Sequence, residues 1–203
     1  MASPGLSRRN FLGALPLTVL SAPAMAHGLC LGSPQLEMGQ EGPRPGFVGP
    51  FSPEEAVAVA ESFMAREIAG LTGKGYPCSE MMLLSALRRF HLPEEHLDAA
   101  AVFGGGVGKR DLCGFLTGGL MAIGFAAGEK YQDRRIVHQV GRLASNAYWE
   151  WWLSRGDQHC MGYGTDHEDS EEFVRMAQRA ALKLEGVMGV LMDGGFEVVE
   201  PAD

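Results

Sequence analysis

A glycine-rich turn that leads into an uncharged helix constrains the fold of this 203-residue chain most strongly. Residues 104–128 begin with Gly-Gly-Gly-Val-Gly, and the part from Leu112 to Gly128 carries no charge. Small residues recur there every four positions, so one face of the predicted helix has no bulky side chain. These residues are Gly114, Gly118, Ala122 and Ala126. A glycine inside a helix costs about 1 kcal/mol relative to alanine, so this face indicates that another backbone comes close. We expect tight helix packing around a buried site, with Gly114 and Gly118 beside a bound cofactor.

A transmembrane helix is the alternative interpretation of the same stretch. A membrane-spanning helix needs about 20 consecutive apolar residues. This run is shorter and rich in glycine. We therefore predict a chain with no membrane span once its N-terminal signal has been removed.

The N-terminus has the three parts of an export signal. Residues 7–12 (Ser-Arg-Arg-Asn-Phe-Leu) match the twin-arginine pattern, an apolar stretch continues to Leu20, and Ala24-Met25-Ala26 forms a cleavage site. We predict that residues 1–26 are a signal peptide that directs the protein to the periplasm by the twin-arginine pathway. That pathway moves folded proteins, typically with a cofactor already bound, which favours a metal or redox centre.

The charge of the chain argues against nucleic acid as a partner. The formal net charge is −8, and removing residues 1–26 takes away two arginines and no acidic residue, which leaves −10. Such a domain repels nucleic acid and anionic membrane surfaces. Its paired basic residues, Arg88-Arg89 and Arg134-Arg135, lie on predicted helices and are expected to face solvent.

Hydrophobic spacing predicts an all-α fold. Apolar residues recur at intervals of three and four, and no stretch alternates with a period of two. We expect a compact antiparallel bundle of about six helices in a domain over residues 51–192, after a flexible leader (27–50) and before an acidic tail (193–203). The predicted helices begin near residues 52, 79, 93, 112, 132 and 171.

Two of these helices carry predictions about which face is buried. In the first, Ser52 and Glu55 form a capping box, and the expected buried stripe comprises Val57, Ala60, Met64, Ile68 and Leu71. In the fifth, it comprises Ile136, Val140, Leu143, Ala147 and Trp151. The aromatic residues at the end of the fifth helix, 148–152, cannot all face one way. We expect core on one side and a homodimer interface on the other, with ligand stacking as the alternative.

Several familiar motifs are incomplete. The turn at residues 104–109 is not a phosphate-binding loop, because Phe103 replaces its first glycine, no Ser or Thr follows Lys109, and a helix precedes it. No C-x-x-C-H motif attaches a c-type haem, and no C-x-x-C pair builds a zinc ribbon or thioredoxin-type site. No nucleophile–base pair or carboxylate pair has catalytic spacing, so we assign no enzymatic reaction.

The cysteines become informative once helix direction is followed. In an up-and-down arrangement, Cys78 and Cys113 start the second and fourth helices, and Cys160 follows the fifth, so all three fall at one end of the bundle. The loop 166–170 falls there too. Helix N-termini lower thiol pKa values and favour thiolates, which bind metals or exchange disulfides. These cysteines are therefore predicted to share a site; three unrelated buried thiols are the alternative.

Together these segments resemble the C_GCAxxG_C_C family of redox-active proteins, over about residues 52–190. The segments that carry the resemblance are Gly-Tyr-Pro-Cys78, Phe103-Gly-Gly-Gly-Val-Gly, Cys113-Gly-Phe-Leu-Thr-Gly118, Gly-Asp-Gln-His-Cys160 and Phe173-Val-Arg. Similar domains occur in split-Soret cytochromes, which hold an iron–sulfur cluster beside their haems. Because the haem motif is absent here, the resemblance implies an iron–sulfur cluster, in [2Fe–2S] form by preference, without haem c.

The chain departs from the family pattern at two positions. Phe115 stands where the family has a small residue, and Ser170 stands where it has its last cysteine. The site is thus one thiolate short. A fourth ligand from His167, Asp169 or Ser170 would complete it, since histidine replaces cysteine in some [2Fe–2S] centres. We favour His167.

Three functions remain open at this point. The first is an iron–sulfur or other metal-binding electron carrier that uses Cys78, Cys113 and Cys160 and meets a redox partner protein. The odd number of ordered cysteines favours it, because disulfides use thiols in pairs. The second is a thiol/disulfide redox protein in which Cys30 supplies the fourth thiol. The third is a non-enzymatic, partner-binding module with a degenerate site.

Overall fold

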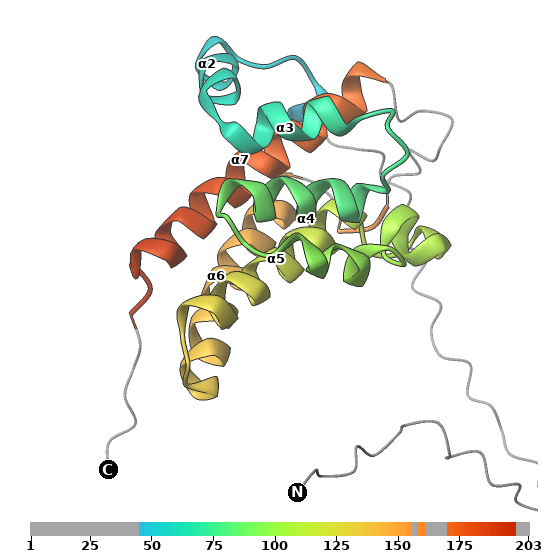
Figure 1. Ribbon diagram of the computed structural model, residues 1–203. Helices are drawn as coiled ribbons and strands as arrows, with labels where there is room; N and C mark the ends of the chain where they lie inside the picture. The colour runs from blue at the N-terminus through green and yellow to red at the C-terminus, as the bar shows by residue number, and fades with distance from the viewer. Residues whose placement is uncertain (1–44, 156–157, 161–169, 198–203) are drawn as a thin grey trace, which may run out of the picture. The chain divides into compact units, whose positions relative to one another are not determined.

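Helices make up most of the chain in the computed structural model, which describes residues 45–155, 158–160 and 170–197 (Figure 1). Within these ranges no strand occurs, and the β-type pairing is a single bridge between Leu112 and His159. The all-α prediction is confirmed. The elements are α1 (Pro45–Val48), α2 (Pro53–Glu61), α3 (Phe63–Leu71), α4 (Cys78–Arg89), η1 (Glu94–Ala100), η2 (Gly106–Arg110), α5 (Gly114–Lys130), α6 (Arg134–Arg155) and α7 (Glu171–Asp193).

Some predicted features lie outside the described residues. They are the signal peptide, the leader up to residue 44 with Cys30, the candidate ligands His167 and Asp169, and the end of the acidic tail. The described elements all belong to one compact unit, residues 40–203.

Helix α5 is the central element, and its bare face lets α4 approach closely. It packs against α4, α6 and α7, and α4 and α5 run side by side in Figure 1. A methyl group on Gly118 would overlap the Ser79 carbonyl of α4 and lie 3.1 Å from Met82 Cβ. On another side of the helix, a methyl on Gly119 would lie 2.5 Å from the Tyr148 ring of α6. The predicted close packing is confirmed.

No described helix, α5 included, is long and apolar enough to cross a membrane. This agrees with the expectation drawn from the shortness and glycine content of the central stretch.

The helices α4, α5 and α7 begin at the same end of the unit. Near that end the rings of Phe115 (α5) and Phe173 (α7) lie 5.2 Å apart between centroids. Near the other end Lys130 Nζ of α5 donates to the Met192 carbonyl of α7. Helix α6 runs the opposite way, because its early residue Gly141 lies beside the late residue Ala127 of α5. The helix-direction argument for the cysteines thus matches the observed directions.

The first predicted helix is broken at Ser62, which ends α2 and caps α3. Its Oγ accepts from Ala65 N–H and donates to Glu185 Oε2 of α7 at 2.5 Å, while Met64 N–H donates to the same oxygen at 3.0 Å. This tertiary contact holds Ser62 in an extended conformation. The single buried stripe was wrong in its first half, because Val57 is 58% exposed and Ala60 is exposed.

Helix α6 buries Val140 as predicted, but the other buried positions lie one residue after the predicted ones. Leu143 is 42% exposed, and the buried positions are Val137, Val140, Ala144, Tyr148 and Trp152. The two largest aromatic side chains of the buried face, Tyr148 and Trp152, occupy the core and fix the rotation of the helix. Trp149 and Trp151 are partly buried against that core. A homodimer stays a prediction.

Two smaller predictions also change. The segment predicted as a third helix is a 3-10 helix, η1, which ends at Ala100. Ser79, near which we predicted the second helix to begin, lies inside α4, where its buried hydroxyl donates to the Ala100 carbonyl at 2.8 Å. The N-cap position of α4 is Pro77, which offers no side-chain hydrogen bond.

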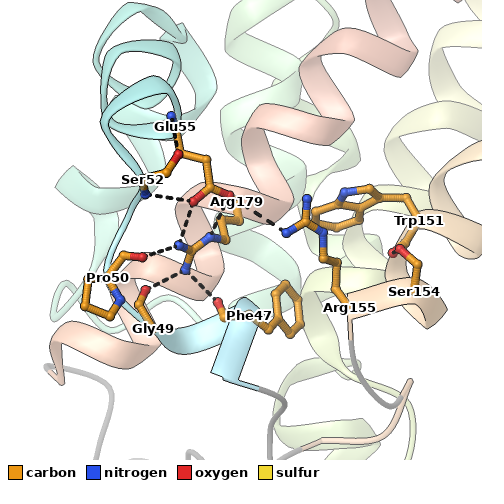
Figure 2. A network of polar contacts seen from close by, with 9 residues as sticks. All are labelled: Phe47, Gly49, Pro50, Ser52, Glu55, Trp151, Ser154, Arg155 and Arg179. Carbon is orange, nitrogen blue, oxygen red and sulfur yellow. Dashed lines mark hydrogen bonds and ion pairs between the residues drawn. The ribbon is translucent and has the colours of Figure 1, made fainter.

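A buried arginine of α7 fixes the end of the predicted leader (Figure 2). Arg179, 4% exposed, donates to the carbonyls of Phe47, Gly49 and Pro50 and to both carboxylate oxygens of Glu55, at 2.8–3.3 Å. These bonds use all five donors of the guanidinium group. We assigned residues 45–50 to a flexible leader, but the structure packs them on α7 with Phe47 fully buried.

Candidate redox site at the cysteine pole

The structure brings together the three cysteines that the sequence predicted to share a site. Cys113 N–H donates to the Gln158 carbonyl at 2.8 Å, and Cys160 N–H donates to the Asp111 carbonyl at 2.6 Å. This short pairing holds the segment after α6 against the segment before α5. We use the name cysteine pole for Cys78, Cys113 and Cys160 with the backbone around them.

Glycines make the contacts of the cysteine pole possible. A methyl group on Gly114 would overlap Cys78 Sγ and lie 2.9 Å from Ser79 N, so the residue after Cys113 has no room for a side chain. A methyl on Gly106 would lie 2.8 Å from Cys160 Cβ. The expectation that Gly114 and Gly118 adjoin a cofactor stays a prediction; in the structure both residues allow close packing.

The glycine-rich turn bends toward Cys78. Residues Gly105, Gly106, Val107 and Gly108 have consecutive positive φ angles of 60°, 61°, 57° and 64°. A left-handed conformation costs a residue such as Val107 about 1 kcal/mol or more. Burial raises the pKa of the Cys78 thiol, and the nearby amides of Gly105, Ser79 and Gly114 lower it by smaller amounts. Asp111 N–H donates to the Gly106 carbonyl at 3.1 Å, which closes the turn. The element that precedes the turn is η1 rather than a strand, as expected of a turn that is not a phosphate-binding loop.

Burial controls the acidity of two of the thiols. Burial raises the pKa of Cys113 far above the ordinary 9.0, and the neighbouring sulfur of Cys78 adds to the effect. The amides of Phe115 and Leu116 lower that pKa without balancing the burial. Burial also raises the pKa of Cys78, against the opposing amide of Gly105. Our expectation that helix starts would favour thiolates was wrong for these two residues, because loss of hydration outweighs the helix-start amides.

The chemistry of the donors suits a soft or borderline metal ion. All three cysteines are free of disulfide bonds, and sulfur ligands select iron–sulfur clusters, zinc or Cu(I). Binding such a centre would release the thiol protons, since metal ligation requires thiolates. In the described part of the chain, however, no three His, Cys, Asp or Glu side chains form a ready metal-binding group. The thiols are neighbours whose ligand set is incomplete there.

Of the three candidates for the fourth ligand, the structure describes Ser170. Ser170 caps α7, where its Oγ accepts from Phe173 N–H at 3.1 Å, so its oxygen already has a structural role. His167 and Asp169 are outside the described residues.

Sequence reasoning missed two side chains near the pole. The Tyr148 hydroxyl donates to the Phe115 carbonyl at 3.2 Å, and burial, with a further contribution from Cys113, raises the tyrosine pKa well above its ordinary value. His159 lies next to Cys160, with Nε2 3.7 Å from Asp111 Oδ1. The position of His159 directly before Cys160 is the sequence feature that could have identified it.

The comparisons with known proteins point to one family. A family model described as "Putative redox-active protein (C_GCAxxG_C_C)" matches residues 76–183, which include all three cysteines of the pole and exclude α1, α2 and α3. Neither the curated proteins nor the solved structures include a significant match. The match covers more than half of the chain, and so the protein belongs to the C_GCAxxG_C_C family of redox-active proteins.

Proposed function

We propose that this chain is an exported redox protein that binds an iron–sulfur cluster or another metal centre through Cys78, Cys113 and Cys160 and transfers electrons to a partner protein. One observation carries the proposal: three free thiols, from segments up to 82 positions apart in the sequence, converge at one end of the helices. The redox-active description of the family supports it.

The surroundings of the thiols suit such a centre. Backbone amides near the sulfurs of Cys78 and Cys113 lower the pKa values of these thiols against the larger effect of burial, and N–H groups so placed stabilise negative charge on a ligating sulfur. Cys113 is 4% exposed, so water is largely excluded from its sulfur. An iron–sulfur cluster bound here would supply one-electron chemistry.

We propose His167 as the fourth ligand, ahead of Asp169 and Ser170. Neutral imidazole binds iron and zinc well, whereas an alcohol is a poor ligand unless deprotonated. The capping bond of Ser170 is a further reason to place it last.

The decisive experiment compares bound iron and zinc and the absorption spectrum in anaerobically purified proteins. Wild type is expected to contain metal, Cys113→Ser to lose it, His167→Ala to retain less, and Cys30→Ser to match wild type. Metal retained in full by His167→Ala would move the fourth ligand to Asp169 or Ser170. A metal-free wild type with a disulfide to Cys30 would overturn the metal centre.

A thiol/disulfide function is the second candidate. It is favoured by neighbouring free thiols that do not form a ready metal-binding group in the described residues. The raised pKa values of Cys78 and Cys113 oppose it, because the thiolate is the species that attacks a disulfide. Mass mapping of disulfides distinguishes the two functions. A wild type with neither metal nor disulfide would indicate the degenerate binding module.

Export by the twin-arginine pathway is tested separately. Replacing Arg8-Arg9 with Lys-Lys is expected to leave the precursor in the cytoplasm, because the pathway reads the arginine pair. Cell fractionation with an antibody against the mature domain measures this. Unchanged export would show that another pathway carries the chain.

A further inference from the structure

A pocket of about 290 Å³ opens beside the Arg179 network, and none of the three cysteines lines it. Its apolar wall includes Trp151 of α6 and Val187 of α7, and its polar groups are Glu55, Arg155, Arg179 and Lys183. Figure 2 shows Arg155 and Trp151 on the far side of Glu55 from the carbonyls that Arg179 binds. Mostly apolar walls with a few convergent polar groups are typical of small-molecule sites.

Among the described residues, the positive charges that line this pocket outnumber the negative ones. Glu55 accepts two bonds from Arg179, whose five donors are all occupied, and one from Ser52 N–H at 3.2 Å. Arg155 is only loosely paired, with Nη1 3.8 Å from Glu55 Oε1. Lys183, half-buried, has no hydrogen-bond or ion-pair partner within the described residues. One carboxylate therefore faces three cations on a chain whose formal net charge is −8.

The aromatic wall is fixed in place. The Trp151 ring stacks on Tyr148 at 6.0 Å between centroids, meets Phe47 edge-on at 5.9 Å, and carries the Arg155 guanidinium at 5.9 Å. Each of these contacts restricts rotation of the indole. A rigid aromatic surface beside a cation suits a planar ligand that ends in an anion.

We propose that this pocket binds a small aromatic carboxylate, with its ring against Trp151 and its carboxylate between Arg155 and Lys183. A neutral aromatic molecule would leave the two cations unused. A polyphosphate carries more negative charge than Arg155 and Lys183 would balance, since Glu55 already offsets the charge of Arg179. This proposed binding site does not depend on the chemistry of the cysteines, and each proposal can be tested without the other.

The test is isothermal titration of the mature protein with 2-naphthoate, in a buffer without carboxylates. Lys183→Gln removes one cation, and Lys74→Gln is the matched control, because Lys74 is exposed and does not line the pocket. Wild type and Lys74→Gln are expected to bind 2-naphthoate alike, and Lys183→Gln roughly fivefold more weakly. Neutral 2-naphthamide should bind more weakly than the acid and be insensitive to Lys183→Gln.

Indole N–H resonances locate the ligand. With ¹⁵N-tryptophan labelling, 2-naphthoate should shift the signal that Trp151→Leu removes; if that variant does not fold, the titrations of the lysine variants decide alone. Absence of binding at millimolar naphthoate, as when another part of the chain fills the pocket, would overturn the proposal. So would equal weakening by the two lysine substitutions, or equal affinity for acid and amide.

Discussion

The Arg179 network and the cysteine pole both bury polar groups between helices, but they differ in how those groups are satisfied. Every donor of Arg179 has an acceptor, and Glu55 offsets its charge. Burial raises the pKa values of the Cys78 and Cys113 thiols, nearby amides only partly oppose it, and no cation of the described residues contributes. Burial thus leaves a fully hydrogen-bonded ion pair in the Arg179 network and uncharged thiols at the cysteine pole.

This difference separates structural from chemical roles. A buried charge with all its partners in place stabilises one docking geometry, and removing it leaves those partners unpaired. Clustered thiols that neither pair with one another nor ionise add little stability, so their convergence is better explained by chemistry. The following predictions test that separation, from the largest expected effect on stability to the smallest.

Arg179→Met should destabilise the fold by about 3 kcal/mol, because three carbonyls and Glu55 lose their partner. Urea unfolding measures the loss. Arg135→Met, whose parent side chain is 81% exposed, is the control and should change stability by less than about 0.5 kcal/mol. Metal or thiol content per folded molecule should match wild type. A loss below about 1 kcal/mol would contradict a structural role for the network.

Gly118→Leu should destabilise by roughly 1–3 kcal/mol or more, since the side chain would enter the backbone of α4. Gly124→Leu is the control on the same helix, because nothing lies within 4 Å of its added Cβ. That substitution should be neutral or stabilise by up to about 1 kcal/mol. Thermal unfolding compares the stabilities of the two variants. Equal losses of stability would mean that the small-residue face of α5 is not what allows α4 to approach closely.

Cys113→Ala should cost only about 1 kcal/mol in metal-free protein, because it removes one buried sulfur and leaves no charge unpaired. The same substitution should abolish metal binding. Chemical denaturation of the chelator-treated protein, beside metal analysis of the untreated protein, separates the effects. A loss of stability as large as that of Arg179→Met would show that the cysteine pole stabilises the fold, as the Arg179 network does, and would contradict the proposed difference between the two regions.

Glu55→Gln should change stability in a pH-dependent way by less than about 1 kcal/mol. The hydrogen bond from Arg179 lowers the pKa of Glu55 below its ordinary 4.5, against the opposing effect of burial. The stabilisation is therefore present above that ordinary value and is lost as pH falls through the lower, folded-state pKa. The difference from wild type should shrink between about pH 6 and pH 3. Glu54→Gln, an exposed neighbour, should show no such trend.

Features that depend mainly on residues a turn or two apart could be predicted from the amino-acid sequence. The helical period predicted an all-α chain, and the spacing of Ser52 and Glu55 predicted the capping box that the structure contains. The four-residue repeat from Gly114 predicted the face that meets α4. Helix order alone placed three cysteines at one end. The first three follow from local geometry, and the placement of the cysteines follows from the alternating direction of successive helices.

Features that depend on partners far along the chain could not be predicted from the sequence. Glu185 breaks the first predicted helix at Ser62, 123 positions away, and Arg179 fixes carbonyls about 130 positions away. Burial by surrounding helices reversed the expected acidity of Cys113. Packing decides how far a side chain is hydrated and which distant residues it contacts. A local sequence pattern predicts neither, because the elements that bury the side chain lie elsewhere in the sequence.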